Sequence, residues 1–150
     1  MFRGVNALNL DVKGRIAMPT RYHNELKQQC DGQLIVTVDR DRCLLIYPQD
    51  VWEVIEQKLS SLPNLEVQAR SLQRLLIGYA TECGMDKSGR ILLPPPLREF
   101  AALEKRVVLI GQGSKFELWN EATWNERCEE WLAVGQDGGP LSVELESLTL

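Results

Sequence analysis

Two matching motifs, 75 residues apart, carry the side chains of this sequence that are best suited to chemistry. They read Asp11-Val12-Lys13-Gly14-Arg15 and Asp86-Lys87-Ser88-Gly89-Arg90. In each motif the Asp can accept backbone N–H groups, and the Gly supplies the positive φ of a tight turn. Each predicted hairpin tip then presents one Lys and one Arg. Arg forms paired hydrogen bonds with phosphate or guanine, and a two-stranded ribbon fits the DNA major groove, so the motifs favour DNA binding.

Two other interpretations of the motifs stay open. Each Arg could simply pair with its own Asp and hold the turn. Alternatively, the Asp-x-x-x-Arg pairs could serve an enzyme in a cleft between the repeats, although no second type of catalytic residue accompanies either Asp. His23 is the only histidine of the chain, and it falls among polar residues of a predicted helix, which favours a solvated surface residue.

The sequence otherwise lacks enzyme and metal signatures. It contains no GxSxG, HExxH or GxxxxGK[ST] motif. The four cysteines form no CxxC pair and match no zinc-site spacing; they are Cys30, Cys43, Cys83 and Cys128. We therefore expect a protein that is not an enzyme and needs neither a metal nor another cofactor.

The motifs belong to an internal duplication that spans most of the chain. A second pair of anchors supports it, because Tyr47 and Trp52 match Trp119 and Trp124 at an offset of 72 residues. We predict a first repeat over 5–52, connecting helices over 53–80, a second repeat over 81–124, and a C-terminal helix with an acidic tail over 125–150. One copy of this length would bury little surface alone, so we expect the two to fold together about a pseudo-two-fold axis.

Hydrophobic periodicity gives each repeat the order strand, turn, strand, short helix, two strands, helix. The strands are predicted at 6–10, 15–18, 33–38, 43–47, 105–111 and 115–119, and the helices at 22–29, 51–62, 64–80 and 121–134. Asn64 is the predicted N-cap of the third of these helices. The pattern indicates a single α+β unit built around a small, interleaved antiparallel barrel.

Composition and charge describe an ordinary globular chain with an uneven charge distribution. Of its 150 residues, 44% are hydrophobic and 25% are charged, which excludes collagen, a disordered tail and a disulfide scaffold. No apolar run reaches the roughly 18 residues of a membrane span, and no signal peptide is evident, so we expect a cytoplasmic protein. The formal charge is −4; residues 117–150 carry −7, which leaves +3 for residues 1–116.

Seven short motifs together resemble the MraZ family of bacterial proteins. They are Met1-Phe2-Arg3-Gly4, Asn9-Leu10-Asp11-x-Lys13-Gly14-Arg15, Pro19-x-Arg21-Tyr22, Leu45-Ile46-Tyr47-Pro48, Gln73-Arg74-Leu75-Leu76, Met85-Asp86-x-x-Gly89-Arg90 and Phe116-Glu117-Leu118-Trp119. They run along most of the chain and become sparse only after about Trp131.

The resemblance implies a tandem pair of AbrB-like modules in a swapped-hairpin β-barrel with flanking helices. It implies a homo-oligomeric ring that binds repeated G-rich boxes in double-stranded DNA, associates with the nucleoid, and represses its own promoter and a division and cell wall gene cluster. The family's Asp-x-x-x-Arg signature maps onto Asp11 and Arg15 and onto Asp86 and Arg90, with Gly14 and Gly89 completing the turns. We therefore expect DNA contacts from Arg15 and Arg90, from Lys13 and Lys87 at the hairpin tips, and from Arg3. Antitoxins with the same module suggest a further possibility, a protein partner bound through the acidic tail.

Overall fold

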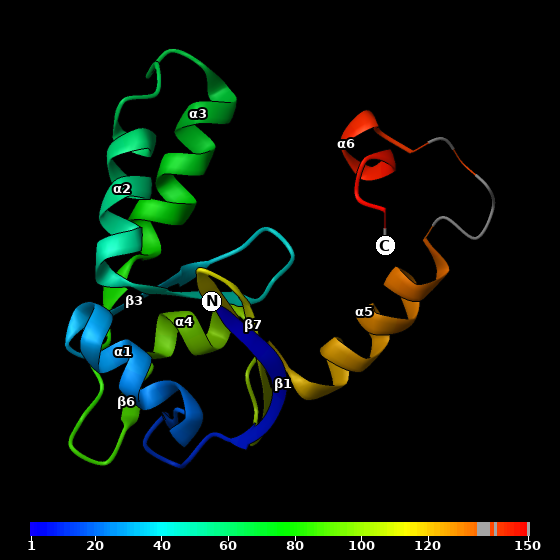
Figure 1. Cartoon of the computed structure of the whole chain (residues 1–150). Helices are drawn as coiled ribbons and strands as arrows, with labels where there is room; N and C mark the ends of the chain where they lie inside the picture. Colours follow the sequence, from blue (N-terminus) through cyan, green and yellow to red (C-terminus); the bar gives the residue numbers. More distant parts are fainter. Residues whose placement is uncertain (135–138, 140, 150) are drawn as a thin grey trace.

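The computed structural model describes residues 1–134, 139 and 141–149 (Figure 1). The strands are β1 (Phe2–Asn9), β2 (Arg15–Ala17), β3 (Leu34–Val38), β4 (Leu44–Pro48), β5 (Thr81–Glu82), β6 (Arg90–Leu92), β7 (Arg106–Gly113) and β8 (Lys115–Asn120). The helices are α1 (His23–Cys30), α2 (Gln49–Ser60), α3 (Val67–Leu72), α4 (Pro95–Phe100), α5 (Glu121–Ala133) and α6 (Val143–Glu146). A 3-10 turn, η1 (Thr20–Tyr22), precedes α1, and a π-helical segment, η2 (Gln73–Ile77), continues α3.

The strands form two open antiparallel sheets. The larger has the order β1-β7-β8-β4-β3-β5, and the smaller consists of β2 and β6. The predicted mixture of helices with antiparallel sheet is therefore confirmed. The strands that the structure describes form no closed barrel, because β1 and β5 remain the edges of the large sheet while β2 and β6 hydrogen-bond only to each other.

Most strand pairings join the two halves of the chain. The hairpins β3–β4 and β7–β8 are local, whereas β1 pairs with β7, β3 with β5, β4 with β8 and β2 with β6. The order strand, strand, helix, strand, strand, helix occurs twice, ending in α2 and in α5. Each half supplies only one local hairpin, and the six-stranded sheet is completed by pairings between the halves, so the halves fold as one unit.

Two hydrophobic clusters lie on opposite faces of the large sheet. The larger cluster buries β2 and β6 together with the inner face of the sheet, and it includes Ile16, Ile91 and Phe116. The second cluster packs Ile35, Leu45 and Tyr47 of the sheet against α2. Because both faces are covered, every residue of β3 and β4 is buried, and these runs are almost entirely apolar, as doubly covered strands require.

The helices depart from the sequence prediction in the connecting segment. Asn64 is not an N-cap, since α3 begins after Glu66 without a side-chain cap. The rest of the predicted helix over 64–80 is confirmed, because α3 and η2 continue one another and the helical run extends over 67–79, with π-helical geometry at Gln73–Ile77. By contrast, the Asn120 side chain accepts the Thr123 N–H and caps α5 at 3.1 Å. None of the described helices is long and apolar enough to cross a membrane.

The arrangement separates two ends of the molecule. Helices α2 and α3 form an arm at one end, and β6 with its turn lies at the other (Figure 1). The two Asp-x-x-Gly turns therefore lie away from the connecting helices and beside the small sheet.

Candidate nucleic-acid interface

The first turn is closed by a carboxylate that accepts backbone N–H groups. Oδ1 of Asp11 accepts the N–H groups of Lys13 and Arg15 at 2.9 and 2.8 Å. The backbone carbonyl of Asp11 accepts the Gly14 N–H at 3.0 Å, and Gly14 has a φ of +90°. Such a φ is costly for residues with a Cβ, so the local sequence suits this conformation.

The second turn repeats this geometry almost atom for atom. Oδ1 of Asp86 accepts the N–H groups of Ser88 and Arg90 at 2.8 and 2.9 Å. The Asp86 carbonyl accepts the Gly89 N–H at 3.0 Å, and φ of Gly89 is +75°. Both positions between Asp and Gly differ in residue type, and all four side chains are exposed: Val12 and Lys13 in one turn, Lys87 and Ser88 in the other.

Each motif Arg also pairs with its own Asp. Nε of Arg15 lies 2.8 Å from Oδ2 of Asp11, and Nε of Arg90 lies 3.2 Å from Oδ2 of Asp86. The ion pair of the turn-holding interpretation is thus present in both copies. It uses only Nε, and within the described part of the chain neither terminal guanidinium nitrogen of either Arg has a hydrogen-bond partner.

These contacts lower the pKa of both carboxyls. For Asp11 the largest cause is the backbone N–H of Arg15, followed among the lowering contacts by the Arg15 side chain. For Asp86 the largest cause is the backbone N–H of Arg90. A carboxylate stabilised in its charged form, with its oxygens already accepting several hydrogen bonds, is a poor general base. The enzyme interpretation of the Asp-x-x-x-Arg pairs therefore gains no support from their geometry.

The small sheet places the two Arg residues on one face. In the register Arg15 pairs with Leu92, Ile16 with Ile91, and Ala17 with Arg90. Ile16 and Ile91 are fully buried in the core, so the residues on either side of them face outward. Arg15 and Arg90 are thus diagonal neighbours on the outer face, with Cα atoms roughly 7–8 Å apart.

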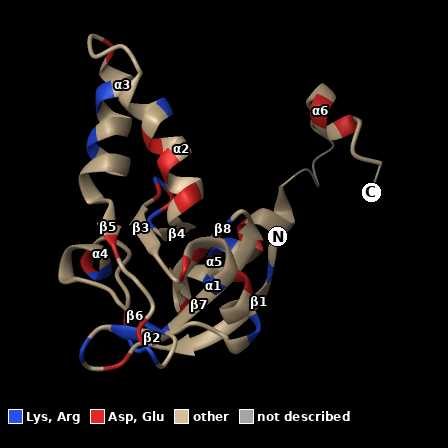
Figure 2. Cartoon of the chain, turned by 60° about the vertical axis from the view of Figure 1, so that its left-hand side comes forward, with Lys and Arg blue, Asp and Glu red and all other residues tan. Residues whose placement is uncertain are grey.

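The small sheet and its two turns form a short ribbon with cations along its length. The pairing continues beyond the strands, because Leu93 N–H donates to the Gly14 carbonyl at 2.8 Å and Met18 N–H donates to the Gly89 carbonyl at 2.9 Å. We call residues 11–18 and 86–93 the β2–β6 ribbon. Its outer side carries four cations and two carboxylates, a formal charge of +2; these residues are Lys13, Arg15, Lys87, Arg90, Asp11 and Asp86. Figure 2 shows Lys and Arg gathered around β2 and β6.

Arg3 lies apart from the other predicted contacts. It is exposed near the start of β1, opposite Gln112 of β7. Asn9 lies six positions further along the extended strand, so Arg3 is about 20 Å from the strand end that leads into the first turn. The structure brings together the four cations of the β2–β6 ribbon and leaves Arg3 outside this group.

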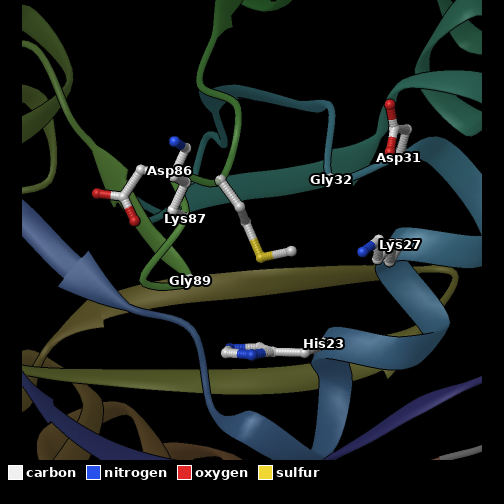
Figure 3. Close-up of a pocket in the computed structure, with 8 residues that line it drawn as sticks. His23, Lys27, Asp31, Gly32, Asp86, Lys87 and Gly89 are labelled. Atoms are coloured by element: carbon white, nitrogen blue, oxygen red, sulfur yellow. The ribbon is translucent and has the colours of Figure 1, made fainter.

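Two residues to which the sequence analysis gave no role at the turns, His23 and Arg98, lie against them. Figure 3 shows His23 beside Gly89 of the second turn. His23 is not the solvated side chain predicted: it is half buried, and its Nε2 lies 2.7 Å from the Met18 carbonyl. It lines a groove of about 440 Å³ between α1 and the second turn, with Lys27 and Lys87. Arg98 of α4 donates from Nε to the Leu93 carbonyl at 2.9 Å. The offset of 75 residues that relates the two turns also relates His23 to Arg98, which is the signal that could have found them.

Metal binding and thiol chemistry find no support in the described residues. They contain no group of three or more His, Cys, Asp or Glu side chains that could hold a metal ion. The four cysteines are free. Burial raises the pKa of the Cys83 thiol to about 11 and that of Cys43 still further, so both thiols stay protonated at neutral pH.

Comparison of the sequence with known proteins identifies the family of the chain. The family model described as "MraZ protein, putative antitoxin-like" matches residues 1–75 and again residues 76–134. The chain belongs to the MraZ family. The two matched segments meet at the offset of the internal duplication, while the finer repeat boundaries stay predictions.

Curated members of the MraZ family match the chain along its full length. A protein of Thioalkalivibrio sulfidiphilus is 60% identical over 150 residues, covering all of both chains. Proteins of Halorhodospira halophila and Pasteurella multocida are 57% and 53% identical, again over all of both chains. Each of the three is named "Transcriptional regulator MraZ".

Proposed function

We propose that the chain is a transcriptional regulator that binds double-stranded DNA through the β2–β6 ribbon. The observation that carries the proposal is the shared outward face of Arg15 and Arg90, whose terminal guanidinium nitrogens are not used within the described chain. The name shared by the MraZ relatives supports the regulatory role.

The size of the ribbon suits a groove of B-form DNA. Gly14 and Met18 mark its two ends on one strand, and four residues of extended chain span about 14 Å. The major groove is about 12 Å wide and accepts a two-stranded ribbon. In this arrangement Arg15 and Arg90 face base edges, and Lys13 and Lys87, at opposite ends of the ribbon, meet the flanking phosphates.

The core behind the ribbon fixes its orientation. Ile16, Met18, Ile91 and Leu93 are each at most 2% exposed, so the strands cannot rotate without losing this burial. A surface held in this way loses little conformational entropy on binding, which favours affinity. We propose that the two open sheets represent the swapped-hairpin, barrel-like arrangement of AbrB-like modules, with the ribbon as its DNA-binding part.

The modest charge of a single ribbon implies that several copies act together. Four cations on one ribbon release few counterions from DNA, so one copy binds weakly at physiological salt. Copies joined in a ring-like homo-oligomer would bind repeated G-rich boxes with a higher effective concentration. Arg3, on the edge strand β1, would then contact phosphates outside the groove that the ribbon occupies.

Within the cell we propose a protein of the cytoplasm and nucleoid that represses its own promoter. The downstream division and cell wall genes would be repressed with it. Binding at the promoter by an oligomer would exclude polymerase without any catalytic step, so the proposal needs no cofactor.

Fluorescence anisotropy with DNA from upstream of the gene's own operon tests this function. The native chain should bind this duplex at least about tenfold more tightly than a scrambled duplex of the same composition. The double variant Arg15→Ala/Arg90→Ala should lose this preference, while Arg70→Ala, which removes the same charge from the exposed side of α3, should keep it. Equal affinity for the scrambled duplex, or full preference in a folded double variant, would overturn the proposal.

A further inference from the structure

His23 and Arg98 occupy equivalent places beside opposite turns. His23 begins α1 in the first half of the chain, and it lies against Gly89 in the second half. Arg98 lies on α4 in the second half, and it lies against Gly14 in the first. Each half therefore supplies the side chain that covers the turn of the other half.

The contacts on the two turns are close. A Cβ at Gly14 would come within 2.8 Å of Nε of Arg98, and a Cβ at Gly89 would come within 2.6 Å of Nε2 of His23. Ordinary van der Waals contact starts at about 3.4 Å, so the covering side chain fills the space beside each glycine. This space is available only because both residues are glycines.

Each covering side chain also holds the strand that pairs with the turn. His23 bonds the carbonyl of Met18, whose N–H donates to Gly89 in the turn that His23 covers. Arg98 bonds the carbonyl of Leu93, whose N–H donates to Gly14 in the turn that Arg98 covers. In both halves a helix side chain thus bonds a strand carbonyl, and the N–H of that same strand residue bonds the glycine carbonyl of the opposite turn.

We infer that His23 and Arg98 are positioning residues for DNA binding, each fixing the hairpin tip of the opposite repeat. The inference rests on the function proposed above for the ribbon. The tip over His23 carries Lys87 and Arg90, and the tip over Arg98 carries Lys13 and Arg15. Fixing the two tips from opposite sides would set the spacing of these cations along the groove.

His23 and Arg98 differ in chemistry, but each holds its strand by one hydrogen bond to a backbone carbonyl. A carbonyl oxygen only accepts, so Nε2 of His23 carries a proton, and the bond to Met18 forms with neutral or charged imidazole. The bond of Arg98 likewise requires one N–H and not its charge. An Arg at 23 should therefore replace His23, because the other half of the same fold already uses Arg there.

Hydrogen exchange followed by NMR measures the positioning without DNA. In His23→Ala the Gly89 and Arg90 amides should exchange roughly 3- to 10-fold faster, as expected for the loss of one hydrogen bond, while those of Gly14 and Arg15 change less than about twofold. Arg98→Ala should show the reverse pattern. His23→Arg should restore native exchange. Gln28→Ala, an exposed substitution on α1, is the matched control and should change neither turn.

DNA affinity measured on the same variants completes the test. His23→Ala and Arg98→Ala should each weaken binding to the operon duplex by roughly tenfold, and His23→Arg should bind within about twofold of the native chain. The positioning role would be overturned if exchange were unchanged in the turn that the substituted side chain covers. It would also be overturned if the turn of the side chain's own repeat loosened instead. Loosened turns with undiminished affinity would separate that role from DNA binding and so overturn the inference. Failure of the native chain to prefer the operon duplex would overturn the proposed function. The exchange results would still show whether His23 and Arg98 hold the turns that they cover.

Discussion

Substitution of Arg15 by alanine separates the two roles that its geometry combines. The side chain pairs with Asp11 through Nε at 2.8 Å and is 28% exposed. Removing a partly exposed pair costs about 0.2–1 kcal/mol, which lowers the melting temperature of a chain of this size by about 1–4 °C. Removing two hydrogen bonds to a guanine edge costs about 1–3 kcal/mol of binding free energy, a 5- to 150-fold loss of affinity.

Three measurements on Arg15→Ala distinguish the roles. If Arg15 reads guanine, affinity for the operon duplex falls and discrimination at one base pair disappears. If it meets only phosphate, all sequences weaken alike, and the slope of log affinity against log salt falls by about 0.9. Arg15→Lys separates these outcomes further, because Lys keeps the charge but lacks the planar fork.

The geometry predicts a small loss of stability together with a large, base-specific loss of affinity. Arg90→Ala should behave in the same way, since its contacts repeat those of Arg15. If the variants had a lower melting temperature but full affinity for DNA, Arg15 and Arg90 would serve only to hold their turns. Normal stability with normal affinity would refute the reasoning for both roles.

Three further predictions follow from the turns and from the charge of the ribbon. Gly14→Val places a Cβ at a φ of +90°, 2.9 Å from the Leu93 carbonyl, so it should cost about 1–3 kcal/mol of stability and weaken DNA binding; full affinity in a folded variant contradicts this. The lowered pKa values of Asp11 and Asp86 mean that their contribution to stability is complete above the unfolded pKa and is lost as the pH falls through the folded one. Urea unfolding should therefore show a larger loss between about pH 5 and pH 2 for the native chain than for Asp11→Asn/Asp86→Asn, and equal losses would count against it. Light scattering at micromolar concentration should detect a homo-oligomer. A monomer that binds DNA tightly would contradict the proposal that several copies must act together.

The ribbon was largely predictable from the sequence because its information is local and is repeated. Asp, Gly and Arg at fixed spacing specify the turn, and the alternation around Ile16 and Ile91 specifies which side is buried. What the spacing could not specify was the partner strand. Residues 15–17 pair with residues 90–92, and only the duplication hinted at a pairing over this distance.

Sequence-based prediction was wrong where contacts between residues distant in the sequence determine the structure. Asn64 has the chemistry of an N-cap, but α3 begins after Glu66. His23 is surrounded in sequence by polar residues, yet folding brings it against Gly89, a contact that no local pattern contains. The predicted barrel required strand pairing at both edges of the large sheet, and β1 and β5 remain unpaired on their outer sides within the described chain.

Methylation interference on the operon duplex tests the central claim most directly. Dimethyl sulfate methylates N7 of guanine, an acceptor on the major-groove edge that a bound Arg contacts. If the β2–β6 ribbon reads the major groove, methylation at particular guanines in each repeated box should block binding of the native chain. Arg15→Ala and Arg90→Ala should each remove the interference at separate guanines. Binding that tolerates methylation at every guanine would contradict major-groove reading by this ribbon.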